Sequence, residues 1–300
     1  MKTNYFYDDE LPDDRVKAFE LYLKATEQGQ VDAQYNLGLC YANGDGVTQD
    51  LTKAVEWYRK AVDQGHAHAQ TMLGWCYANG DGVTKDFTRA AEWWEKAAEQ
   101  GNANAQSNLG VCYANGDGVT QDFKKAVEWY QKAAEQGDDW AQYNLGLCYA
   151  SGDGVTQDFK KAAKWCRKAA EQGDAEAQTM LGWCYGDGKG VTKNVIKAVE
   201  LFRMAAAQGN AVAQNNLGAC YARGEGVEED FTKVVELFCM AAEQGDDVAQ
   251  YNLGLCYVNG KGVKKDFTKA AELFRKAVKQ GNTPAQHILD VMLSERHVCN

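Results

Sequence analysis

Hydrophobic and polar residues follow a helical period along almost the whole chain, and the pattern itself recurs every 36 residues. In residues 266–281, the apolar side chains fall at the i, i+3, i+4 and i+7 spacing of a single helical stripe. These side chains are Phe267, Ala270, Leu273, Phe274, Ala277 and Val278. The spacing predicts an amphipathic helix, which we call helix B, at this place in every repeat.

Both ends of helix B carry residues that are typical of helix termini. An Asp precedes the stripe in every repeat except one, where Asn194 takes its place, and such a side chain can accept hydrogen bonds from the free N–H groups of the first turn. The Asp residues are Asp50, Asp86, Asp122, Asp158, Asp230 and Asp266. Gly65 and its equivalents follow the stripe, where a helix commonly ends in a left-handed residue. We therefore expect local sequence to fix both ends of helix B.

A shorter apolar-periodic segment, helix A, precedes each helix B, as in residues 31–44. Gly38 lies in its middle, where glycine costs about 1 kcal/mol relative to alanine in an isolated helix. We expect packing to compensate, because a glycine lets a neighbouring helix approach closely. The turn between the helices offers Gly44 and Gly46 for positive φ angles and Val47 as an apolar plug beneath the helix pair.

The repeats follow one another without an insertion, and cysteines mark their common register. Those cysteines are Cys40, Cys76, Cys112, Cys148, Cys184, Cys220 and Cys256. Residues 14–29 match helix B alone, and residues 283–297 match helix A alone. Since one hairpin cannot bury its own apolar surface, the hairpins must stack. We expect an all-α solenoid of about sixteen helices, with an N-terminal segment and capping helix (1–29), seven repeats (30–281) and a C-terminal capping helix (282–300).

The repeated residues resemble the Sel-one-like repeat, a helical-hairpin repeat related to the tetratricopeptide repeat. The resemblance covers residues 14–297 and rests on Leu37-Gly38 in helix A, Tyr41 before the turn, and the Asp that opens helix B. It implies a right-handed α/α superhelix whose helix A faces line a concave surface, and a non-catalytic adaptor or scaffold role. Secreted cysteine-rich relatives carry two cysteines per repeat, whereas here only Cys166 and Cys239 provide a second one. The hydrolase-type activity suggested for those relatives is the alternative, together with a purely structural role.

Composition and net charge limit the classes of molecule that this protein is expected to bind. Hydrophobic residues make up 45% of the chain and charged residues 25%, which is ordinary for a folded protein. The net charge of −10 would repel phosphate backbones, so we expect no nucleic acid. No apolar stretch is long enough to span a membrane, and the N-terminus lacks the apolar segment of a signal peptide. We expect a cytoplasmic monomer that binds a protein or peptide segment, without membrane insertion.

No residue pattern predicts a catalytic site, a metal site or a cofactor. There is no CxxC pair, and the cysteines of successive repeats should lie roughly 10 Å apart, beyond disulfide reach. We expect all ten cysteines to be reduced thiols. The turn that contains Asp45 lacks the alternating oxygen ligands of a calcium-binding loop. His66 and His68 are two residues apart, a spacing that does not place both side chains on one helical face. We expect these histidines to be solvated residues at the start of a helix.

Aromatic side chains recur at one place in helix B, and we interpret them as core. They include Trp57, Tyr58, Trp93, Trp94, Trp129, Tyr130 and Trp165. From the fifth repeat onward this pair becomes Leu-Phe, as in Leu201 and Phe202, which preserves apolar volume.

The repeats differ from one another mainly on one side of helix A, at the positions of Asp32, Tyr35 and Leu39. These positions fall within about 60° on a helical wheel, so we expect one strip per helix that binds a partner. The alternative is a solvated surface that has drifted. The predicted partner-binding residues are Asp32, Tyr35, Asn36, Leu39, His68, Trp75, Asn108, Trp140, Tyr143, Asn144, Leu147, Trp183, Asn216, Tyr251 and Asn252. We expect the centre of the site at Trp140, Tyr143, Asn144 and Leu147 in the fourth repeat, where the asparagine could bond the backbone of an extended peptide.

Overall fold

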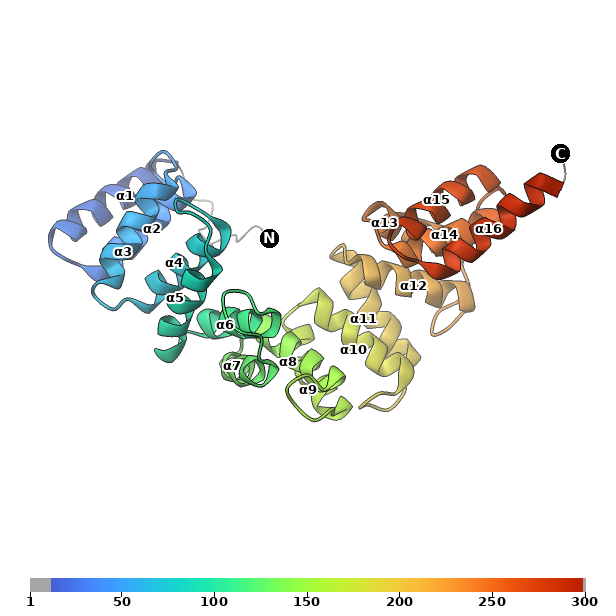
Figure 1. Cartoon of the computed structure of the whole chain (residues 1–300), viewed down its shortest axis with the longest axis horizontal. Helices are drawn as coiled ribbons and strands as arrows, with labels where there is room; N and C mark the ends of the chain where they lie inside the picture. The colour runs from blue at the N-terminus through green and yellow to red at the C-terminus, as the bar shows by residue number, and fades with distance from the viewer. Residues whose placement is uncertain (1–11, 299–300) are drawn as a thin grey trace. The chain divides into compact units, whose positions relative to one another are not determined.

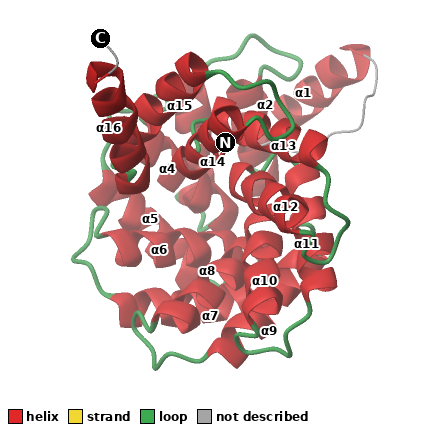
Figure 2. Ribbon diagram, turned by 90° about the vertical axis from the view of Figure 1, so that its right-hand side faces the viewer, coloured by secondary structure: helices red, strands yellow, loops and turns green. Residues whose placement is uncertain are grey.

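The computed structural model describes residues 12–298, and within this range it contains helices and no strand (Figures 1 and 2). The helices are α1 (Pro12–Glu27), α2 (Val31–Asn43), α3 (Leu51–Val62), α4 (Ala67–Asn79), α5 (Phe87–Glu99), α6 (Ala103–Asn115), α7 (Phe123–Glu135), α8 (Asp139–Ser151), α9 (Phe159–Glu171), α10 (Ala175–Asp187), α11 (Val195–Ala207), α12 (Ala211–Arg223), α13 (Phe231–Glu243), α14 (Asp247–Asn259), α15 (Phe267–Lys279) and α16 (Thr283–Val298). The prediction of an all-α solenoid is confirmed. Even-numbered helices are helix A and odd-numbered helices are helix B, and we number the repeats from one (α2 and α3) to seven (α14 and α15).

The two helices of a hairpin approach so closely that glycine is required in helix A. A Cβ atom added to Gly110 would lie 2.6 Å from two carbons of the buried Tyr130 ring. The same relation holds for Gly38 with Tyr58, Gly74 with Trp94, Gly182 with Phe202, Gly218 with Phe238 and Gly254 with Phe274. The close approach predicted from Gly38 is therefore confirmed, and its partner is the aromatic ring of the same hairpin.

Local sequence fixes the helix ends as predicted. Asp50 is extended and its side chain accepts a hydrogen bond from the backbone N–H of Lys53 at 3.0 Å, while Asn194 accepts one from Lys197 at the same distance. Gly65 lies in the turn that follows α3 and has a φ angle of +84°. Gly44 and Gly46, in the turn between α2 and α3, have φ angles of +80° and +70°. The predicted cap and turn residues therefore act where the sequence placed them.

Each turn packs onto the start of the preceding helix B. A Cβ on Gly82 would overlap the backbone carbonyl of Leu51, and one on Gly118 would overlap that of Phe87. Val83, in the same turn as Gly82, packs against the buried clusters of the first and second repeats. The turn is therefore a part of the core between hairpins, as the plug predicted at Val47 suggested.

Glutamine side chains link the two helices of each hairpin, and in several repeats they also reach the preceding hairpin. In every repeat the glutamine that follows helix B donates to the buried glutamine of helix A, at distances from 2.7 Å for Gln100 and Gln70 to 3.2 Å for Gln280 and Gln250. The helix A glutamine can then donate to the preceding helix B, as Gln106 does to the carbonyl of Ala98 at 3.1 Å. These bonds satisfy buried carbonyl groups at the end of helix B, which water does not reach.

The chain divides into two compact units whose boundary falls within α8. The first unit runs to Ala141 and includes Asp153–Thr156, and the second contains Gln142–Gly152 and the chain from Gln157 onward. Each unit has its own buried clusters, such as those around Tyr58 and Trp94 in the first and those around Phe202 and Phe274 in the second. The surfaces below are therefore described within one unit at a time.

Candidate interaction surface

The helix A position of Asp32 lies on the open surface. Asp32, His68, Glu176 and Val248 are exposed at this position, and Trp140 is half-buried. The position of Asp32 lies about 120° around helix A from the central glycine that faces the helix B ring, so it is not directed at that ring. This part of the predicted strip is accessible to a partner.

The position of Tyr35 is not open, and the expectation that it lies on a solvent strip is wrong for most repeats. Its counterparts Thr71, Ser107, Thr179 and Asn215 are buried. Tyr35 itself is half-buried, with its ring stacked on His66 at 4.8 Å and tilted against Tyr58 at 6.2 Å between ring centroids. A helical wheel considers one helix alone, whereas this position meets both helix B of its own repeat and the start of the next helix A.

Tyr143 is packed for a further reason. The fourth repeat has Cys166 where the other repeats have a buried aromatic ring, and Tyr143 packs against the cluster that contains Cys166. Burial raises the pKa of Tyr143 to about 12. Tyr251, at the same position in the seventh repeat, lies 5.9 Å from the ring of Phe274. We infer that Tyr143 fills volume that the smaller cysteine leaves, so it contributes to the core.

The predicted asparagines are half-buried, and Asn216 and Asn252 hold hydrogen bonds within the second unit. Asn216 donates to the backbone carbonyl of Val212 at 2.8 Å, and Asn252 donates to the side chain of Asn215 at 2.9 Å. Bonding a peptide through these amide groups would require exchange of those bonds. Asn36, Asn108 and Asn144 are also half-buried.

The position of Leu39 contains the most exposed tryptophan. Leu39 and Leu147 are half-buried, and Trp75 rests edge-on against Trp94 with ring centroids 5.5 Å apart. Trp183, in contrast, is 43% exposed. A tryptophan is a large apolar group that a partner can cover at low cost in conformational entropy.

The residues predicted as the centre of the site divide between the two units. Trp140 belongs to the first unit, whereas Tyr143, Asn144 and Leu147 belong to the second. The backbone N–H of Trp140 donates to the side chain of Asp139 at 2.9 Å. Within the second unit, the accessible part of the predicted strip is therefore best represented by Trp183.

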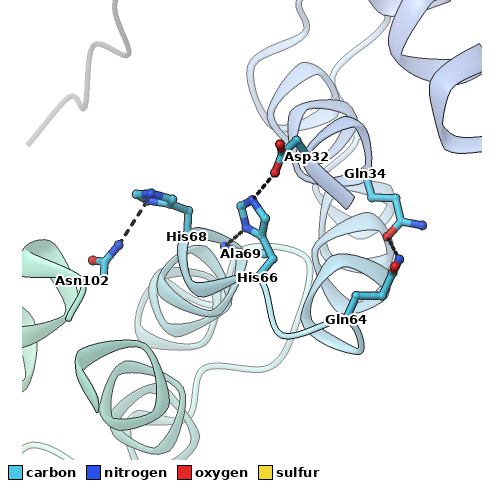
Figure 3. A network of polar contacts seen from close by, with 7 residues as sticks. All are labelled: Asp32, Gln34, Gln64, His66, His68, Ala69 and Asn102. Carbon is cyan, nitrogen blue, oxygen red and sulfur yellow. Dashed lines mark hydrogen bonds and ion pairs between the residues drawn. The ribbon is translucent and has the colours of Figure 1, made fainter. Parts of the chain in front are cut away.

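The close pair of histidines takes part in a polar network between the first repeats (Figure 3). The Nε2 atom of His66 lies 3.2 Å from a carboxylate oxygen of Asp32, and its Nδ1 accepts a hydrogen bond from the backbone N–H of Ala69 at 3.1 Å. His68 is exposed, with its Nδ1 3.1 Å from the amide nitrogen of Asn102. The expectation of solvated histidines is thus right for His68 and wrong for His66, whose side chain is only 13% exposed.

Burial makes the thiols poor nucleophiles. The cysteines from Cys40 to Cys256 are free thiols, whereas Cys299 and the side chain of His297 lie outside the part described. Burial raises the pKa of Cys40 to about 11 and that of Cys76 to about 12. A thiol with a raised pKa has little of the thiolate form that attacks substrates or binds metals. Between residues 14 and 292, no three His, Cys, Asp or Glu side chains are arranged to hold a metal ion.

The prediction that the helix B aromatics are core residues holds fully at only one of their two positions. Tyr58, Trp94 and Tyr130 are buried, as predicted. The tryptophans one position earlier in helix B, including Trp165 before Cys166, are half-buried, and each lies beneath a lysine ammonium group. The pairs are Trp57 with Lys60 at 3.7 Å, Trp93 with Lys96 at 4.2 Å, Trp129 with Lys132 at 3.8 Å and Trp165 with Lys168 at 4.5 Å from the ring centroid. The lysine three residues after each of these tryptophans could have predicted the cation–π pairs from the sequence, because residues at i and i+3 lie side by side on a helix.

Comparison with known proteins identifies the repeat. The Sel1 repeat, which is the Sel-one-like repeat named above, matches residues 4–30, 31–66, 67–102, 103–138, 141–174, 175–210, 211–246 and 247–282. No curated protein gives a significant match. Among solved structures, c5321, described as a protective antigen of uropathogenic Escherichia coli strains displaying an SLR fold, is 40% identical over 90% of this chain, with a TM-score of 0.79. The chain spans 58% of the length of that protein.

A second structure, a Sel1 repeat protein from Oxalobacter formigenes, is 35% identical over 95% of this chain and 82% of its own, with a TM-score of 0.70. None of the helices in the described part of our chain is long and apolar enough to cross a membrane.

Proposed function

Because the chain belongs to the Sel1 repeat family, we propose that it is a non-catalytic adaptor that binds a protein segment along the exposed face of helix A. The resemblance predicts that this face is concave. Its exposed residues at the position of Asp32 differ between repeats, as would be needed to recognise one partner. Solenoids commonly use such extended faces for binding.

The exposure of Trp183 carries this proposal. It is the one tryptophan among the exposed large apolar side chains of residues 14–292, and it lies at a variable helix A position. With 43% of the residue exposed, Trp183 leaves a large apolar area in solvent, and a partner that covers this area would explain its presence. Val248, which is 44% exposed, offers a second apolar contact on the same kind of helix.

The experiment begins by identifying proteins that the full chain retains from a native lysate, and then measures their affinity for purified variants. Trp183→Ala should weaken binding by about 2 kcal/mol, the size typical of an anchor residue, without changing the unfolding temperature. Met204→Ala is the matched control, because Met204 is 50% exposed but lies on helix B. If only the Met204 variant weakens binding, the partner contacts helix B and the proposed face is wrong.

The hydrolase alternative would require a nucleophile or an acid–base pair with a suitable environment. The buried thiols have pKa values raised by desolvation, which works against attack by cysteine. No observation on the described residues favours this alternative over a binding role.

A further inference from the structure

A solvent-open cavity of about 340 Å³ lies where the turn of the fifth repeat meets the end of α9. Its walls are Arg167 from α9, Tyr185 from α10, the turn residues 191–194, and Lys197 from α11. This volume is at the lower end of the range typical of small-molecule sites, about 300 to 1,000 Å³. All of these residues belong to the second unit.

The cavity is lined by three cations, Arg167, Lys193 and Lys197, and by no carboxylate. Arg167 donates to the hydroxyl oxygen of Tyr185 at 3.2 Å, which leaves the tyrosine O–H available as a donor. The ammonium group of Lys197 lies 5.4 Å from the centroid of the same ring. Within residues 14–292, none of these cations forms an ion pair.

Asn194 is the reason that the charge here is uncompensated. At this position the other repeats have an aspartate that caps helix B, and its carboxylate often pairs with the basic residue three positions later. Such pairs are Asp50 with Lys53 at 3.5 Å, Asp86 with Arg89 at 3.5 Å and Asp230 with Lys233 at 3.4 Å. Asn194 keeps the capping hydrogen bond from the N–H of Lys197 but has no negative charge.

The other repeats show that this combination is specific to one junction. Arg59, Lys85 and Arg89 form the same set of cations between the first and second repeats, but there Asp86 adds a carboxylate. Elsewhere at least one cation is replaced. The replacements include Leu23, Glu95, Gln131 and Cys239 at the position of Arg167, and Glu229 at the position of Lys193.

We propose that this cavity binds a phosphoryl group, as the dianion of a phosphate ester. A phosphate monoester carries about −1.5 to −2 charges at pH 7, which the cations around the cavity can balance, whereas a carboxylate would neutralise only one of them. The guanidinium group of Arg167 presents a planar set of N–H donors that matches phosphate oxygens, and the hydroxyls of Tyr185 and Thr192 are further donors on the wall. Apart from Tyr185, the lining residues lie on helix B and the turn, so this site does not depend on the proposed helix A face.

The test is calorimetric titration of the full chain at low ionic strength with inorganic phosphate, and with a short peptide that contains phosphoserine. Both probes carry the phosphoryl group, and the tighter one shows whether the source is a free phosphate compound or a phosphorylated segment. The key variant is Asn194→Asp, which restores the residue that the other repeats use as a cap, so the helix should keep its start.

Asn194→Asp should weaken the binding of both probes about tenfold or more, the size that Coulomb's law gives for a carboxylate and a dianion a few ångströms apart in water. A second change, Asp86→Asn, made in the Asn194→Asp variant, should restore binding at a different place. It removes the carboxylate beside Arg59, Lys85 and Arg89 and so recreates the uncompensated set of cations between the first and second repeats. The proposal is overturned if neither probe binds saturably to the natural chain, or if Asn194→Asp leaves the affinity unchanged.

Discussion

The glycines of helix A allow a pair of substitutions with opposite expected effects. Gly110→Ala would place a Cβ atom 2.6 Å from two ring carbons of Tyr130, a ring that is only 2% exposed and cannot move into solvent. Gly186 is also helical, but a Cβ there would have only ordinary contact, 3.8 Å from the Cβ of Ala198. The fourth and sixth repeats have alanine at the position of Gly186, namely Ala150 and Ala222.

The magnitudes follow from two opposing effects. Alanine gains about 1 kcal/mol over glycine inside a helix, and overpacking a filled core costs about 1 to 3 kcal/mol. Since Gly110→Ala meets two ring atoms at once, we take the upper end of the overpacking range, which leaves a net loss of about 2 kcal/mol. Gly186→Ala has no overpacking cost, so we expect a gain of about 1 kcal/mol.

Urea unfolding followed by circular dichroism, with the natural chain as reference, measures both changes. The urea midpoint of each variant is compared with that of the natural chain. If the slope of the unfolding free energy against urea concentration is unchanged, a shift in midpoint reports a change in stability and not a change in the surface exposed on unfolding. The reasoning is refuted if Gly110→Ala is as stable as the natural chain, because the helices would then not require glycine to approach. It is equally refuted if Gly186→Ala is destabilising.

Further predictions concern titration and thiol chemistry. His66 has a pKa below the ordinary value of 6.5, chiefly because burial disfavours its charged form, and its Nδ1 must stay unprotonated to accept the N–H of Ala69. Its contribution to stability should therefore be complete above pH 6.5 and be lost as the pH falls below that value toward the folded pKa. Denaturant unfolding at several pH values should show a smaller loss in His66→Asn, which keeps a capping side chain, and equal losses would contradict this account. Burial also raises the pKa of Cys112 and Cys166 to about 12, so a thiol reagent at pH 8 should label them slowly in the native chain and promptly after denaturation. Denaturation without reductant should release all ten thiols, and a count of eight or fewer would indicate disulfides.

Local chemistry was sufficient to predict the helices, their ends and the repeat. Asp50, Gly65 and Gly44 act through their own backbone neighbourhood, so their roles do not depend on what lies further along the chain. Gly38 was interpretable because a mid-helix glycine has a known cost that only close packing offsets, although the ring of Tyr58 as its partner became visible only in the structure.

The candidate surface was predicted less well, because exposure depends on neighbouring helices. The position of Tyr35 looked open on a wheel, but the start of the next helix A, at His66, covers it. His66 looked solvated because its contact with Asp32 joins residues from two different hairpins. The cationic cavity likewise needs Arg167 from one repeat and Lys197 from the next, which are 30 positions apart in the sequence. The sequence by itself thus determined the hairpin, its caps and its stacking, since these follow from local propensity and apolar period. Only the tertiary structure decided which variable side chains remain open and which charges gather, because both depend on contacts between repeats that a single helix does not contain.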